Sequence, residues 1–134
     1  MPLEWTNDLA VGVEEIDNQH KELFRRINNL LDACVQGKGK DEVLSILKFL
    51  DDYVIVHFTA EEGLQKRYNY PNYTSHKTLH AEFKKSIYDI KKMIEDEGLG
   101  PHLIFRMHRT VVDWWFEHIG RADKEFGSFL QGKI

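Results

Sequence analysis

Four amphipathic segments, separated by short breaks rich in glycine or proline, constrain this chain more than any other feature of its sequence. Apolar residues recur at helical spacing over about residues 17–35, 41–67 and 75–95, and from Pro101 onward. The stretches QGKGK, YNYPNYTS and DEGLGP separate these segments. Helices of this length with short connections favour an antiparallel, up-down-up-down four-helix bundle, so we predict an all-α fold.

The residues outside the four segments predict two smaller features. The first sixteen residues show no helical period and contain Trp5, so we expect an extended N-terminal arm packed across the bundle, with Asp17 capping the first helix. The sequence KEFGSFLQGKI near the end predicts one short C-terminal helix. No internal repeat or change of composition marks a second domain, and residues 1–134 are therefore expected to form one.

The composition excludes several classes of protein. With 42% hydrophobic and 30% charged residues, it is typical of a soluble globular protein. The net charge is −4 and the two signs are mixed, which argues against binding to nucleic acid or membranes. No apolar run is long enough to span a bilayer, and the N-terminus lacks a signal-peptide pattern. Cys34 is the only cysteine, so an internal disulfide is excluded. We expect a cytoplasmic monomer.

Polar residues interrupt the apolar face of the second segment. His57 and Glu61 lie one helical turn apart and continue the stripe formed by Leu50, Val54 and Leu64. A single histidine on such a face is more often a hydrogen-bonded core residue than a metal ligand. A buried glutamate is harder to explain in that way, because it costs several kcal/mol unless it is paired or coordinated.

Each of the other three segments also directs histidine inward. His20 lies on the inner face of the first segment, His76 and His80 on that of the third, and His118 on that of the fourth. In an antiparallel bundle, the starts of odd helices and the ends of even helices meet at one end, so these residues can form a single layer. His102 and His108 lie ~15 Å or more from His118 along the helix, and we interpret them as ordinary surface or cap residues.

Metal coordination explains these inward polar residues together. Five imidazoles exceed what one zinc or iron ion normally takes, which implies two metals. Asp123 is the best candidate for a second carboxylate, but it can join His118 only if the helix ends or bulges near Gly120. With two bridging carboxylates and one bridging oxygen, these ligands leave one position open on a pair of six-coordinate metals. The sequence contains neither the H-E-x-x-H motif of zincins nor any Glu-x-x-His pair of the ferritin-like di-iron type.

The stretches DNQHKELF, HFTAEE, HKTLH and HIGRAD together resemble the hemerythrin family, in particular its single-domain bacterial members, the bacteriohemerythrins. VGVEEID and WWFEHI add to the resemblance, which covers nearly the whole chain. It implies a non-haem di-iron centre, bridged by oxide or hydroxide, that binds O2 reversibly. By this resemblance, one iron is held by three histidines and another, with the open position, by two, and two carboxylates bridge them. The implied metal ligands are His20, His57, Glu61, His76, His80, His118 and Asp123.

The resemblance therefore implies an oxygen-binding protein, for storage, delivery or sensing, and not an enzyme. Two alternatives stay open at this point: a di-iron enzyme that acts on nitric oxide or peroxide, and a protein of iron homeostasis. A dry pocket should surround the bound O2, and aromatic or aliphatic residues within about one turn of a ligand are the candidates for its lining, although core packing explains the two tryptophans equally well. The candidates are Leu23, Phe24, Phe58, Trp114, Trp115 and Ile119.

Overall fold

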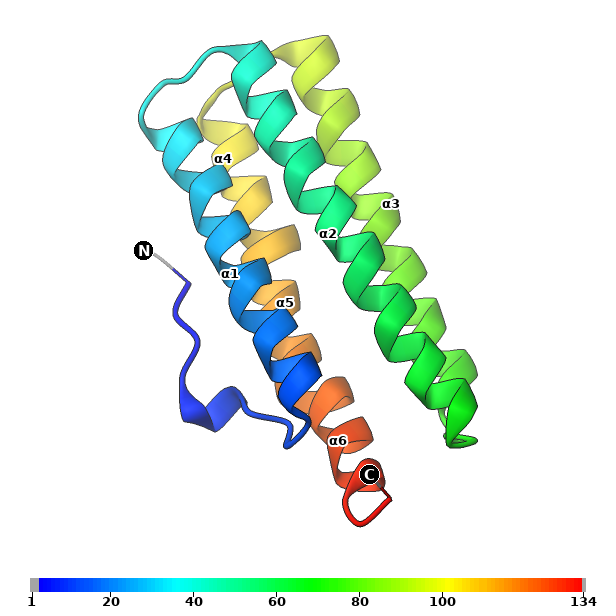
Figure 1. Cartoon of the computed structure of the whole chain (residues 1–134). Coiled ribbons are helices and arrows are strands. Elements are labelled where there is room, and N and C mark those ends of the chain that lie inside the picture. The colour runs from blue at the N-terminus through cyan, green and yellow to red at the C-terminus, as the bar shows by residue number, and fades with distance from the viewer. Residues whose placement is uncertain (1–2, 134) are drawn as a thin grey trace.

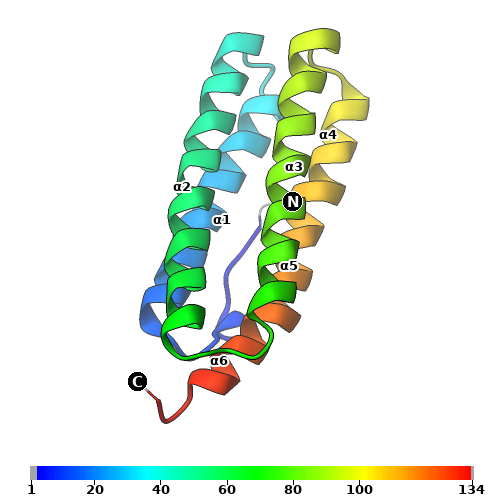
Figure 2. The ribbon, with the colours of Figure 1, turned by 90° about the vertical axis from the view of Figure 1, so that its right-hand side faces the viewer.

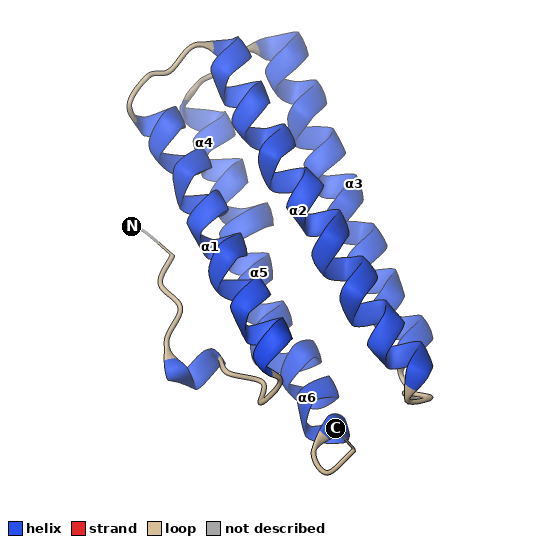
Figure 3. Ribbon diagram, in the orientation of Figure 1, coloured by secondary structure: helices blue, strands red, loops and turns tan. Residues whose placement is uncertain are grey.

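The helices form the antiparallel bundle that the sequence predicts (Figure 1). The structure is a computed structural model and describes residues 3–133. Its first three long helices are α1 (Glu14–Val35), α2 (Lys40–Arg67) and α3 (Tyr73–Glu97). The fourth continues from residue 101 to 130 through α4 (Pro101–Met107), η2 (His108–Val112), α5 (Asp113–His118), η3 (Ile119–Asp123) and α6 (Lys124–Leu130). No strand occurs within residues 3–133 (Figure 3).

The apolar stripes of the four helices meet in one core. α1 packs against α2, α2 against α3, and the fourth helix against both α1 and α3. Ile27, Leu50, Ile90 and Met107 represent the four helices in this core, and all four are fully buried. Burial of such a side chain stabilises the fold by ~1.5–3 kcal/mol, which favours the arrangement in which all four apolar stripes face inward. The periodicity of the sequence identifies these stripes and therefore the faces that pack.

Two turns of π-helix, η2 and η3, interrupt the fourth helix. A π turn forms hydrogen bonds from residue i to i+5 and shifts the following residues around the helix axis. The sequence predicts a bulge near Gly120, and η3 confirms it, whereas η2 was not expected. The predicted short C-terminal helix is α6, which follows η3 directly and continues the fourth helix (Figure 1).

The N-terminal arm runs along α1 and contains one short 3-10 turn, η1 (Asn7–Leu9), as Figures 1 and 2 show. Its Leu3 is buried, and the backbone of Leu3 exchanges two hydrogen bonds of 2.7 and 2.8 Å with the side chain of Asn28. The prediction that Asp17 caps α1 is wrong, because the helix begins at Glu14. The Asp17 carboxylate instead accepts a hydrogen bond of 2.8 Å from the amide of Val11, which fixes the turn between arm and helix.

The antiparallel arrangement brings the starts of α1 and α3 to the same end of the bundle as the end of α2 and α6 (Figure 2). The predicted polar layer requires this arrangement. Among residues 3–133, no helix is both long and apolar enough to cross a membrane.

Candidate metal centre

Within residues 3–133, eight polar or charged side chains are buried in the core, and seven of them belong to the residues that the sequence predicts as metal ligands. α1 contributes one, α2 and α3 two each, and the fourth helix the remaining two, so the layer is built from every helix of the bundle. The seven are His20, His57, Glu61, His76, His80, His118 and Asp123; the eighth is Gln65.

Helix geometry explains how each segment presents its pair. On α2 and on α3, residues four apart lie on one face, which aligns His57 with Glu61 and His76 with His80. His118 and Asp123 are five residues apart, a spacing that a regular α-helix would direct to different faces. The π turn η3 lies between them and leaves His118 Nε2 only 3.1 Å from Asp123 Oδ1.

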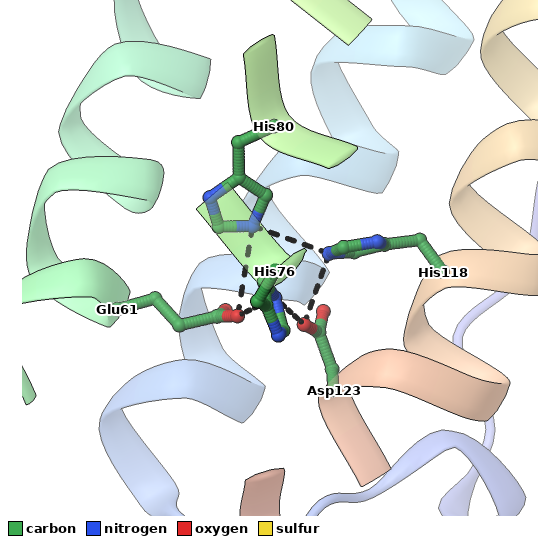
Figure 4. A group of neighbouring side chains, drawn as sticks. All are labelled: Glu61, His76, His80, His118 and Asp123. Carbon is green, nitrogen blue, oxygen red and sulfur yellow. Dashed lines mark hydrogen bonds and ion pairs between the residues drawn. The ribbon is translucent and has the colours of Figure 1, made fainter. Parts of the chain in front are cut away.

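Three histidines surround one side of the layer, where their Nε2 atoms face the two carboxylates (Figure 4). His76 Nε2 lies 2.5 Å from Glu61 Oε1 and 3.0 Å from Asp123 Oδ1. His80 Nε2 lies 3.7 Å from the same glutamate oxygen and 3.2 Å from His118 Nε2. One ligand atom from each of these five residues lies within 4.8 Å of all the others, close enough for a single metal ion.

Two further histidines face the other oxygen of each carboxylate. His20 Nε2 lies 3.0 Å from Asp123 Oδ2, and His57 Nε2 lies 3.3 Å from Glu61 Oε2. These four residues form a second group whose ligand atoms also lie within 4.8 Å of one another. Glu61 and Asp123 thus each present one oxygen to the group of three histidines and one to the group of two.

The imidazole nitrogens and carboxylate oxygens are better placed to bind a pair of metal ions than to form hydrogen bonds with one another. The Nε2 atoms of His20, His57 and His76, and both oxygens of each carboxylate, are buried and make no hydrogen bond of acceptable geometry with the described residues. These atoms therefore lie close together because their side chains point to the same two positions, and not because they form hydrogen bonds with one another. A buried polar atom without a hydrogen-bond partner costs free energy. So many unpartnered nitrogen and oxygen atoms in one place are therefore expected only where a cation binds them.

The electrostatics of the cluster favour the deprotonated, metal-binding form of three of these residues, His57, His80 and Asp123. Burial lowers the pKa of His57, and burial together with neighbouring imidazole charges lowers the pKa of His80 to about 2. Burial opposes protonation of His76 as well, but the adjacent carboxylates of Asp123 and Glu61 raise its pKa to about 9. Burial raises the pKa of Asp123, and the adjacent imidazoles outweigh this effect and hold it well below its usual range.

Two of the histidines are oriented through their other ring nitrogen. His57 Nδ1 lies 2.7 Å from Gln19 Oε1, and His80 Nδ1 lies 2.8 Å from Glu62 Oε2. Such contacts fix Nε2 as the nitrogen that faces the site. Sequence reasoning did not single out Gln19, although it directly precedes His20 and lies at the edge of the inner face of α1.

Gln65 was also missed. We expected Leu64 to continue the inner stripe of α2, but Leu64 is only half-buried. Gln65, four residues after Glu61, occupies the inward position and is fully buried. The spacing from Glu61 could have revealed this position, but a glutamine is not expected in an apolar stripe.

Most of the residues proposed to line an apolar pocket are buried around the layer. Leu23, Phe24, Phe58, Trp115 and Ile119 are all buried. The ring of Trp115 lies 5.8 Å from that of His57, and Phe58 stacks on His80 with 3.8 Å between ring centroids. Their rings cover the core side of the histidines.

Trp114 occupies a different position. It stacks on His118 at 4.3 Å and lines a surface hollow of about 300 Å³ together with Leu79 and Arg121. It therefore lies on the outer side of the group of three histidines. His102 is exposed and His108 half-buried on the fourth helix, and neither belongs to either ligand group.

Comparisons with known proteins agree with this geometry. Residues 11–130 match the family model of the hemerythrin HHE cation binding domain. A bacteriohemerythrin of Pseudomonas aeruginosa is 34% identical over 122 residues, which cover 90% of this chain and 76% of that protein. A hemerythrin-like protein of Naegleria gruberi is 32% identical over 96% of this chain and 94% of its own length. The crystal structure of a hemerythrin variant with a leucine-to-alanine substitution superposes with a TM-score of 0.83 at 30% identity, covering 96% of this chain and 97% of that one.

Proposed function

Because this chain belongs to the hemerythrin HHE cation-binding family, we propose that it holds two iron ions in the buried layer and binds O2 reversibly. One observation carries the proposal: Glu61 and Asp123 each direct one oxygen to three histidines and the other oxygen to two. A protein that binds a single metal has no need for two complete groups of ligands that share both carboxylates.

The two groups are assigned different tasks. His76, His80 and His118 hold the iron whose coordination is filled by protein and bridging ligands. His20 and His57 would hold the second iron, which would have fewer protein ligands and so an open position. A ferrous pair, if bound here, would supply the two electrons that reversible O2 binding requires. The mainly neutral imidazole ligands would suit an uptake and release of O2 in which the buried site gains no net charge.

The surrounding side chains exclude water from the open position. The indole of Trp115 lies 5.8 Å from His57 and 6.2 Å from His20 between ring centroids, and it is fully buried. Leu23, Phe24 and Ile119 add apolar surface nearby in sequence and are also buried. An apolar site of this kind favours a small uncharged ligand over ions and protects a bound ligand from proton exchange with water.

The proposed setting is a cytoplasmic monomer that stores, delivers or senses O2. Cys34 is a free, buried thiol, which suits a reducing compartment. The large exposed apolar residues come from several different helices, such as Val35 on α1, Tyr88 on α3 and Phe105 on α4. Exposure of apolar residues on several helices is normal for a soluble protein and does not by itself require a partner.

Anaerobic reconstitution with Fe(II) tests the proposal. We expect about two irons per chain and an absorption change on exposure to O2 that reverses under vacuum. Binding of about two irons followed by irreversible oxidation at the first exposure would refute reversible O2 binding. Sustained turnover of nitric oxide or peroxide by the same sample would instead identify an enzyme.

A pair of variants tests the bridging assignment. Glu61→Ala should reduce the bound iron to one ion or fewer, because both groups lose a ligand. Glu117→Ala is the matched control, since this glutamate lies on the exposed face of α5 and, among the described residues, its ion pair is a surface one with Arg121. If the Glu61 variant still binds two irons as tightly as the control, the assignment of a shared carboxylate is wrong.

A further inference from the structure

The two groups of histidines differ in the side chains that their Nδ1 atoms contact. In the group of two, His57 Nδ1 meets the side-chain oxygen of Gln19, a neutral amide, at 2.7 Å. In the group of three, His80 Nδ1 meets the carboxylate of Glu62 at 2.8 Å. His20 Nδ1 is buried and has no hydrogen-bond partner among residues 3–133. The group of two therefore has no anionic acceptor in its outer contacts, whereas the group of three has one.

This difference has an electronic consequence. An imidazole that donates its N–H to an acceptor becomes a more basic ligand at its other nitrogen. The effect is larger for an ionised acceptor, because hydrogen bonds to a charged group are about twice as strong as those between neutral groups. A more basic ligand stabilises Fe(III) over Fe(II), so His80 favours the oxidised metal more strongly than His57 or His20.

We propose that Gln19 and Glu62 are positioning residues that make the two iron sites unequal, with the more oxidising iron at His20 and His57. The inference deepens the proposed function and rests on it. The neutral Gln19 orients His57 without the electron donation that a carboxylate would add. The open iron is thereby kept ferrous in the absence of O2, and Glu62 directs electron density to the filled iron.

The location of both residues supports this role. Gln19 reaches from α1 to a histidine on α2, and Glu62 reaches from α2 to a histidine on α3, so each contact joins neighbouring helices. Both side chains are only partly exposed, which reduces screening by solvent. Glutamine and glutamate have nearly the same shape, and exchange of one for the other changes charge with little change in packing.

Redox titration of the iron-loaded protein without O2 tests the inference. In Gln19→Glu, we expect the Fe(III):Fe(II) ratio of one iron to rise on the order of tenfold at a fixed applied potential, equal to ~59 mV for one electron. Glu62→Gln should lower that ratio for the other iron. Mössbauer spectra of the partly oxidised samples should show which iron changes.

A purely structural role would give another pattern. It predicts that both exchanges loosen a histidine and weaken iron binding, with shifts of the potential in the same direction or none. Opposite shifts in the two variants support the inference, and equal or absent shifts overturn it. Gln19→Leu, which removes the acceptor, should shift the potential opposite to Gln19→Glu.

A measurement on the metal-free protein separates this inference from the proposed function. Nitrogen NMR of the imidazoles should find the proton of neutral His57 on Nδ1, and Gln19→Leu should change this tautomer preference. If the protein takes up fewer than two irons while this tautomer result holds, the proposed function fails and the orienting role of Gln19 stands. If the tautomer does not respond to Gln19→Leu, the role of Gln19 is refuted whatever the iron content.

Discussion

Gln65 gives the sharpest test of the energetics in this core. The residue is fully buried on the inner face of α2, and neither its amide nitrogen nor its oxygen has a hydrogen-bond partner among residues 3–133. Methionine has nearly the same length and volume and a similar helix propensity. The substitution Gln65→Met therefore removes two unsatisfied polar atoms without leaving a cavity or forcing the helices apart.

The expected gain follows from the cost of those atoms. An unsatisfied buried polar group costs ~1–3 kcal/mol, and its replacement by an apolar group of the same shape recovers much of that cost. For a domain of this size, a change of 1 kcal/mol shifts Tm by about 3 °C. We therefore expect Gln65→Met to raise the Tm of the metal-free protein by roughly 3–9 °C.

Thermal unfolding followed by circular dichroism, with urea unfolding as a second measure, would determine the change. Gln19→Met is a matched control, because Gln19 has a partner in His57 and its loss should lower Tm. An unchanged or lower Tm for Gln65→Met would refute the reasoning. It would mean that the Gln65 amide is satisfied in solution and contributes to the stability of the polar layer.

Three further predictions concern the arm, the metal-free cluster and the aromatic wall. Gly127→Ala should destabilise the protein by ~1–3 kcal/mol and expose the arm to proteolysis, because a Cβ there would overlap the backbone of Val11. The Tm of the metal-free protein should fall as pH rises from about 6.5 to 9, because protonated His76, with its pKa raised to about 9, stabilises the fold below this range and loses its proton within it. Scanning calorimetry at several pH values would show this, and a rising Tm would contradict it. Phe58→Ala should cost ~3–5 kcal/mol in urea unfolding, since the fully buried ring stacks on His80 and its loss leaves a cavity; a loss below 1 kcal/mol would contradict this.

Periodicity is the part of this fold that the sequence expresses most directly. Each helix buries an apolar stripe that polar residues interrupt near one end of the bundle. The spacing of Ile27, Leu50, Ile90 and Met107 within their segments is a local property that needs no knowledge of neighbours. The ends of helices are less certain. Asp17 shows the reason, because its side chain bonds to the arm and not to the first turn of a helix that it was expected to cap.

The arrangement of the metal centre was only partly predictable. That His57 and Glu61 share a face follows from their spacing, whereas the meeting of His118 and Asp123 required a π turn that spacing alone could suggest but not establish. The outer partners Gln19 and Glu62 could not be assigned, since both contacts cross between helices. Polar residues without a distinctive spacing give no signal until the neighbouring helix is in place.

The sequence by itself determined four helices, their buried faces and a set of polar residues at one end of the bundle, because helical periodicity and chain direction depend only on the order of residues. Only the tertiary structure decided how those residues are arranged into two groups of candidate metal ligands. It showed that each carboxylate presents one oxygen to each group of histidines, that the buried Gln65 amide has no hydrogen-bond partner within residues 3–133, and that the two groups differ in their outer acceptors. These features depend on separations of about 3 Å between atoms on different helices, and no pattern along a single helix specifies such distances.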